Sequence, residues 1–185
     1  MRTAVYSGSF DPLHKGHLAI LRSLSEDSRF DRTLLVVSPQ NPLKEVSKAE
    51  SGQARYEAAA KALGRYPELK VTLDDIELRM PPPHYTIRTL DALRQREPDS
   101  TFTLVIGADN LAHIRRWKDY RRILLEFGVL VYPRKGFDTE ALKQELLCES
   151  GEYRIELLDA PLVDISSTQI RNALASGQDV SEYLF

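Results

Sequence analysis

Residues 7–17 read SGSFDPLHKGH, and they join an apolar run at residues 3–6 to a segment with helical periodicity. The apolar run predicts a first β-strand, and leucines at positions 18, 21 and 24 predict a helix after the junction. Asp11 suits the N-cap of this helix, and Pro12 suits its first helical position. The stretch therefore predicts a strand, a tight loop and a helix N-terminus in immediate succession.

Two histidines follow this loop. His14 and His17 are three residues apart, so we expect both on one face of the first helical turn. Gly8 and Gly16 allow a backbone or a ligand to approach where a Cβ would intrude. Free N–H groups, the positive end of the helix dipole and two imidazoles then converge on one point that suits phosphate. The simpler alternative is a plain strand-to-helix turn with two surface histidines.

The same stretch resembles the signature of the (H/T)xGH nucleotidylyltransferases, Gly-x-Phe-Asp-Pro-x-His-x-Gly-His. The resemblance implies a Rossmann-like fold in which this loop, including Gly8, Ser9 and Phe10, holds the phosphates of ATP. Many members of the family have glycine where this chain has Ser7. Because serine is small, we expect a local backbone adjustment there and no lost chemistry.

Composition narrows the class of protein. A chain of 185 residues with 42% hydrophobic and 28% charged residues predicts one globular domain over residues 1–185. The net charge of −2 does not favour a nucleic-acid partner. Cys148 is the single cysteine, which excludes an intrachain disulfide and a multi-cysteine zinc site. No apolar run approaches the ~20 residues of a membrane span, and we expect no signal peptide, no membrane partner and a cytoplasmic location.

Apolar strands and periodic helices alternate along the chain. We expect strands at residues 33–37, 69–73, 103–106, 129–132 and 154–158, and helices at 53–63, 86–95, 139–147 and 167–175, with one or two helices over 111–126. This order predicts an α/β fold, a Rossmann-like doubly wound parallel sheet with helices on both faces. Ligands of such sheets bind at the carboxyl ends of the strands. Two loops interrupt the alternation, residues 38–52 and the prolines 81–83.

A second phosphate site is predicted at residues 164–171, DISSTQIR. Ser166 and Gln169 match a capping box, and Arg171 adds a fixed charge one turn later. On its own this pattern also fits an ordinary capped helix. It resembles, however, the second signature of the family, which implies that Ile165, Ser166, Ser167, Thr168 and Arg171 contact the phosphates of ATP.

Three further segments resemble bacterial nicotinate-mononucleotide adenylyltransferases. In residues 38–44, SPQNPLK, the resemblance places Lys44 near a phosphate, although a solvated loop lysine is the usual alternative. In residues 84–90, HYTIRTL, it places Thr86 and nearby backbone N–H groups against the pyridine carboxylate; Thr86 could also be an N-cap. It also implies that Trp117 stacks on the pyridine ring, whereas a core position is the ordinary role of tryptophan.

Two more positions concern the nucleotide. Gly107 and Asp109 belong to a segment, IGADNL at 106–111, that resembles the same subfamily. Gly107 would let the nucleotide lie close to the strand end, and Asp109 would accept hydrogen bonds from ribose or adenine, or else cap a helix. Arg134 matches a family position near the adenine or ribose.

The resemblance implies that the chain transfers AMP from ATP to nicotinate mononucleotide, giving deamido-NAD and pyrophosphate. His14, His17 and Arg171 would stabilise the triphosphate, with the histidines protonated beside it, and Mg²⁺ would accompany ATP without a metal site of the protein's own. Alternatives are an adenylyltransferase for nicotinamide mononucleotide or phosphopantetheine, and a non-catalytic nucleotide-binding module. A dehydrogenase is a poor fit, because residues 7–9 lack its Gly-x-Gly. A homo-oligomer is left open, since relatives usually continue beyond the position of Leu184.

Overall fold

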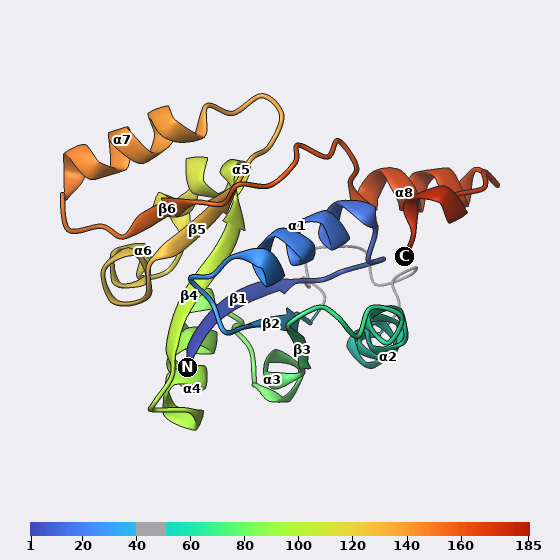
Figure 1. Cartoon of the computed structure of the whole chain (residues 1–185), viewed down its shortest axis with the longest axis horizontal. Coiled ribbons are helices and arrows are strands. Elements are labelled where there is room, and N and C mark those ends of the chain that lie inside the picture. The colour runs from blue at the N-terminus through green and yellow to red at the C-terminus, as the bar shows by residue number, and fades with distance from the viewer. Residues whose placement is uncertain (40–50) are drawn as a thin grey trace.

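Six parallel strands form one sheet in the computed structural model, which describes residues 1–39 and 51–185. The strand order is β3-β2-β1-β4-β5-β6 (Figure 1). The strands are β1 Arg2–Gly8, β2 Arg32–Val37, β3 Val71–Asp74, β4 Thr101–Gly107, β5 Val129–Tyr132 and β6 Ile155–Leu157. The order reverses between β1 and β4, so the topological switch point lies at the carboxyl ends of the two central strands.

Helices connect the strands and cover both faces of the sheet. The longer helices are α1 Lys15–Glu26, α2 Gly52–Leu63, α4 Thr86–Arg96, α7 Thr139–Glu149 and α8 Ser167–Ala175. Shorter helical elements are α3 Ile76–Arg79, α5 Ala108–Ala112, η1 Ile114–Arg116, α6 Tyr120–Arg122, η2 Ile123–Phe127 and η3 Ser181–Tyr183. In Figure 1, α8 begins beside the first turn of α1, at the opposite end of the molecule from α7.

The core has two halves because side chains alternate across each strand. On one face, Val5 and Leu104 of the central strands pack with Leu90 of α4 and Leu111 of α5. On the other face, Tyr6 and Val105 and their neighbours pack with residues of α1 and α2, among them Leu21 and Ala59. Helices on both faces of an all-parallel sheet are the doubly wound architecture that the alternation of strands and helices predicts.

Most predicted elements are confirmed, and the differences occur at boundaries. The strand at 129–132 and the helix at 167–175 have the predicted bounds. The segment 111–126 contains several short helical elements, α5 extending into it from Ala108, instead of one or two helices. The first helix begins at Lys15, with His14 as its N-cap, so the assignment of Asp11 and Pro12 to the helix start is wrong. Ser7 keeps its parallel register opposite Val36.

Within residues 1–39 and 51–185, no helix is long and apolar enough to cross a bilayer.

Candidate active site

The loop after β1 folds back on its own strand. Phe10 has a φ of 46°, in the left-handed region, and its ring is buried against Tyr6 with centroids 5.3 Å apart. The gain from burying this ring offsets the cost of the unusual backbone conformation. A Cβ at Gly8 would lie 3.1 Å from the Phe10 ring, so the glycine leaves room for the return of the chain. This turn brings the following histidines to the carboxyl end of the sheet.

Two interlocked hydrogen bonds fix the two histidines. His14 is the N-cap of α1, and its Nδ1 accepts the Gly16 N–H at 3.1 Å. His17 Nδ1 accepts the His14 N–H at 3.1 Å, which completes a capping box. The two rings are stacked with centroids 3.7 Å apart. Because each Nδ1 is an acceptor, the proton of each neutral ring is on Nε2. Both Nε2–H groups therefore remain as donors.

The two imidazoles are neutral in the unliganded protein. Burial, together with the positive charge of Arg134, lowers the pKa of His14 to about 4. The pKa of His17 is lowered well below its ordinary value by burial, by His14 and by Arg134. Protonation would also cost the two capping bonds, since a protonated Nδ1 cannot accept. The pKa values describe the site without ATP, and protonation of the histidines beside the triphosphate stays a prediction.

The second signature lies against the first, although the two are far apart in the chain. Ser166 caps α8 through the predicted capping box with Gln169. Ser167 Oγ donates to the carbonyl of Pro12 at 3.1 Å, and Arg171 donates to the carbonyl of Asp11 at 2.6 Å. The N-termini of α1 and α8 therefore meet at one place and present their unpaired N–H groups together.

A cavity of about 150 Å³ opens between these two helix starts. His14, His17 and Arg134 line it, and so do Ile165, Ser166 and Ser167. A neighbouring cavity of about 270 Å³ shares Arg134, Ile165 and Ser166 and adds Lys135 and Gln169. The cations Arg134 and Lys135 line this pair of cavities together with the carboxylates of Asp109 and Asp164. The N–H donors of the two helix starts at the ends of the strands suit a polyphosphate.

Asp109 lies in the first turn of α5 at the edge of these cavities. Its Oδ1 is 3.6 Å from Arg134 Nε, and it accepts no hydrogen bond from the described residues although the atom is buried. Such an acceptor is able to take a donor from a ligand. A Cβ at Gly107, the residue that caps α5, would collide with Asp109 Oδ1 and lie 3.1 Å from Arg134 Cγ. Asp109 is therefore not the helix cap, and Gly107 makes space for its side chain.

A larger cavity of about 750 Å³ lies beside the first and is lined by the two predicted acceptor residues, Thr86 and Trp117. Thr86 is the first residue of α4, and the N-cap is Tyr85, whose side chain forms no capping bond. The N-cap interpretation of Thr86 is therefore wrong, and the first N–H groups of α4 are not capped by a side chain. Trp117 is partly buried against the core and also lines the cavity, so its two interpretations are compatible.

The loop before α4 is held by its own side chains. Arg88 donates to the carbonyls of Pro81 and Pro83, and His84 contacts the carbonyl of Met80 at 2.9 Å. These bonds close the proline segment over the N-terminus of α4. The wall of the large cavity is thereby fixed by His84 and Arg88, which lie in a segment that the sequence marked but for which it predicted no such contacts.

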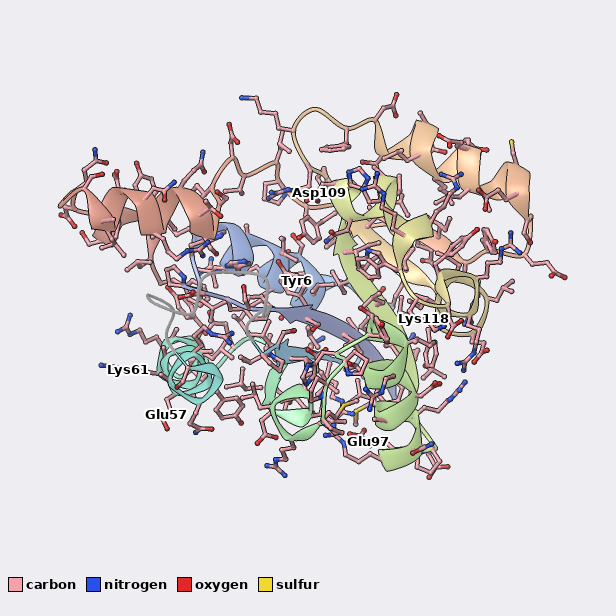
Figure 2. The ribbon with its side chains drawn as sticks, turned by 180° about the vertical axis from the view of Figure 1, so that it is seen from behind. Tyr6, Glu57, Lys61, Glu97, Asp109 and Lys118 are labelled. Carbon is pink, nitrogen blue, oxygen red and sulfur yellow. The ribbon has the colours of Figure 1, made fainter. Side chains whose placement is uncertain are left out.

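Tyr6 and Tyr132 join the two cavities, since both residues line each of them. Their ring centroids are 5.9 Å apart at a steep angle. Burial and the neighbouring Tyr132 raise the pKa of Tyr6, and burial raises the pKa of Tyr132, so both phenols stay neutral. Figure 2 labels Tyr6 on β1 and Asp109 at the end of β4, the adjacent strand. Two ligands in the two cavities would meet at this tyrosine pair.

The structure separates the predicted site residues into two groups. The cavities are lined by His14, His17, Thr86, Asp109, Trp117, Arg134, Ile165, Ser166 and Ser167. Other predicted residues lie around the site without lining any of these three cavities: Gly8, Ser9, Phe10, Gly107, Thr168 and Arg171. Lys44 lies outside the described residues.

Two buried charged residues near the site were missed. Arg55 of α2 is 2% exposed and donates to the carbonyls of Ser9 and Ser38, so it ties together the loops after β1 and β2. Glu77 of α3 is 4% exposed and lines the large cavity. No spacing in the sequence marks either residue, because their partners come from other elements.

The site defines a nucleotide-binding protein of the Rossmann-like class, with the ligand cavities at the topological switch point. The profile of the cytidylyltransferase-like family matches residues 5–173, and the chain belongs to this family. A probable nicotinate-nucleotide adenylyltransferase from Bacteroides fragilis is 38% identical over 183 residues, covering 99% of this chain and 87% of that protein. One from Flavobacterium johnsoniae is 35% identical, covering 100% of this chain and 92% of that protein.

A solved structure confirms the fold. Plasmodium falciparum nicotinic acid mononucleotide adenylyltransferase complexed with NaAD superposes with a TM-score of 0.80 at 20% sequence identity, covering 99% of this chain and 90% of that chain. The predicted Rossmann-like nucleotidylyltransferase fold is therefore correct.

Proposed function

We propose that this chain is a nicotinate-nucleotide adenylyltransferase. It transfers the AMP moiety of ATP to nicotinate mononucleotide and releases deamido-NAD and pyrophosphate. The observation that carries the proposal is the pair of cavities joined at Tyr6 and Tyr132: one has the two histidines, and the other has Thr86 and Trp117. A mononucleotide and a nucleoside triphosphate in these cavities would bring an acceptor phosphate next to the α-phosphate.

The reaction needs positioning and charge stabilisation more than covalent help from the protein. The 5′-phosphate of the acceptor attacks the α-phosphorus of ATP in line, and pyrophosphate leaves. His14 and His17 donate from Nε2 to the phosphate oxygens, with their geometry fixed in advance by the capping bonds. The approach of a polyphosphate favours a protonated imidazole, so the charge of the pair can increase as ATP binds.

The N-terminus of α8 holds the β- and γ-phosphates in this proposal. Ser166 and Ser167 line the cavity, and Arg134 adds a positive charge from the loop after β5. Arg171 uses some of its donors on Asp11 and on Thr168, which leaves further N–H groups of the guanidinium for phosphate.

Mg²⁺ would accompany ATP and reduce the negative charge of the triphosphate. The described residues contain no group of three or more His, Cys, Asp or Glu side chains that could hold a metal ion. In this proposal, phosphate oxygens and water coordinate the ion. The Oδ1 of Asp109, buried and without a hydrogen bond from the described residues, is a carboxylate oxygen that could support such an ion or the ribose.

The N-terminus of α4 selects the acceptor. Its N–H groups and the Thr86 hydroxyl favour the carboxylate of nicotinate over the neutral amide of nicotinamide, because the positive end of a helix dipole attracts an anion. Trp117 stacks on the pyridine ring. The proposal also includes a single domain over residues 1–185 and a cytoplasmic location, and it leaves a homo-oligomer open.

Pyrophosphate release from ATP tests the proposal. The purified protein is given ATP and Mg²⁺ with nicotinate mononucleotide, nicotinamide mononucleotide or phosphopantetheine, and the dinucleotide product is separated chromatographically. Deamido-NAD formation at the highest kcat/KM is expected. Turnover restricted to either of the other acceptors would replace the proposed substrate, and the absence of turnover with all three would favour a binding module.

A further inference from the structure

Glu77 is a buried carboxylate on the wall of the large cavity. Only 4% of its surface is exposed, and no described residue forms an ion pair with it. Its Oε1 accepts hydrogen bonds from Ser7 Oγ at 3.0 Å and from Thr89 Oγ1 at 2.9 Å. A buried carboxylate is costly unless it is paired or fully hydrogen-bonded. Glu77 thus lies at a ligand cavity with fewer hydrogen-bond donors than its carboxylate can accept.

The direction of the hydrogen bonds follows from the chemistry. An ionised carboxylate only accepts, so Ser7 and Thr89 both donate to Glu77. Ser7 has then used its proton, and the 2.9 Å contact between Ser7 Oγ and Ser38 Oγ is a bond that Ser38 donates. Both hydrogen bonds to Glu77, from Ser7 and from Thr89, end on Oε1. The other oxygen, Oε2, accepts no hydrogen bond from the described residues.

The partners of Glu77 place it between the two ends of the acceptor site. Ser7 follows Tyr6, which lines both cavities and marks the phosphate end. Thr89 is one helical turn after Thr86, which lies at the end assigned to the pyridine ring. In a mononucleotide, the ribose is the group between the phosphate and the base.

Nicotinate mononucleotide can offer Glu77 few donors. Its phosphate and its carboxylate are anions that accept hydrogen bonds and are repelled by a carboxylate. Its two ribose hydroxyls are the groups that can donate. We propose that Glu77 Oε2 accepts a hydrogen bond from a ribose hydroxyl of the acceptor, which makes Glu77 a specificity-determining residue of the acceptor site. This inference rests on the proposed function.

The test compares nicotinate mononucleotide with its 2′-deoxy and 3′-deoxy analogues. The measured quantity is the discrimination ratio, defined as kcat/KM for nicotinate mononucleotide divided by kcat/KM for the deoxy analogue. For at least one analogue the wild-type ratio should be about 10 to 100, the range for loss of a hydrogen bond to a charged group. In Glu77→Gln, which keeps the shape and removes the charge, that ratio should fall at least about threefold, because neutral hydrogen bonds are weaker. The KM for ATP should be unchanged.

Thr89→Val is the matched control. It removes a donor to Oε1 and leaves Oε2 in place, so it should lower kcat/KM for all three acceptors by a similar factor and keep the ratio. A wild-type ratio near one for both analogues would overturn the inference. It would equally be overturned by an unchanged ratio in Glu77→Gln, or by an equal drop of the ratio in Thr89→Val. An enzyme inactive on nicotinate mononucleotide would instead refute the proposed function.

Discussion

Gly16→Ala should lower kcat strongly while it changes the free energy of unfolding little. A Cβ at Gly16 would lie 2.8 Å from Cε1 and 2.9 Å from Nδ1 of His14. Real Cβ atoms do not tolerate such distances, so the imidazole must move. It has little room, since His14 is 4% exposed and its ring is stacked on His17 at 3.7 Å. The substitution therefore displaces the Nε2–H donor of His14.

The energetic terms nearly cancel for folding but not for catalysis. Alanine in place of glycine within a helix favours the folded state by roughly 0.5–1 kcal/mol. Loss of the His14 capping bond to the Gly16 N–H costs about 1 kcal/mol. The free energy of unfolding should thus change by no more than about 1 kcal/mol. Misplacement of a catalytic donor by about 1 Å costs on the order of 100-fold in rate, and kcat should fall accordingly.

Urea unfolding and steady-state kinetics with ATP and nicotinate mononucleotide measure the two quantities. Gly151→Ala is the matched control, because a Cβ there meets nothing within 4 Å and the residue has no positive φ. It should leave both quantities close to wild type. A kcat of Gly16→Ala within threefold of wild type would refute the reasoning. A loss of stability above about 3 kcal/mol would show that the capping box matters for folding more than for the site.

Three further predictions concern the same site. His17→Ala should lower kcat by about 100-fold or more, the effect of removing one preorganised donor; an unchanged kcat in steady-state assays would remove His17 from the mechanism. The pKa of His14 is lowered to about 4 and that of His17 is also lowered, so between pH 4 and 6.5 the unfolded chain binds more protons than the folded one. The free energy of unfolding should therefore fall as pH falls through this window, by up to about 1.4 kcal/mol per pH unit for each histidine. Urea unfolding at several pH values measures this dependence. His14→Asn, which can still cap the helix, should make the free energy of unfolding depend less on pH. Thr86→Val should lower kcat/KM for nicotinate mononucleotide more than for nicotinamide mononucleotide; an equal loss on both acceptors would contradict a contact with the carboxylate.

Sequence patterns were sufficient where the determining interactions are local. The strand Val129–Tyr132 follows from an apolar run, and the start of α8 follows from the side chains of Ser166 and Gln169, three residues apart. The start of α1 is local as well, yet the prediction of Asp11 as its cap is wrong. An imidazole Nδ1 can accept a backbone N–H as a carboxylate does. At His14 this cap depends on stacking against His17, which holds the ring in place.

Contacts between distant segments could not be read from the sequence. The bonds from Ser167 to Pro12 and from Arg171 to Asp11 connect the two signatures across more than 150 residues, and only the fold shows that they form one site. The family resemblance associated the signatures with the same phosphates without revealing this junction. Glu77 illustrates the same limit, since its hydroxyl donors come from β1 and α4.

The resting charge of the histidine pair is the property that depends most on the fold. From the sequence, an imidazole near phosphate is expected to be protonated, because its ordinary pKa is near 6.5. In the folded chain Phe10 and Tyr6 pack around His17, and Arg134 faces both rings, so burial and like charge favour the neutral form. The Nε2–H donors are nevertheless in place before ATP arrives, because the capping bonds fix the tautomer. The site can therefore bind phosphate without first acquiring a proton. Its histidines become positively charged only when the negative charge of a bound ligand offsets the cost of a buried cation.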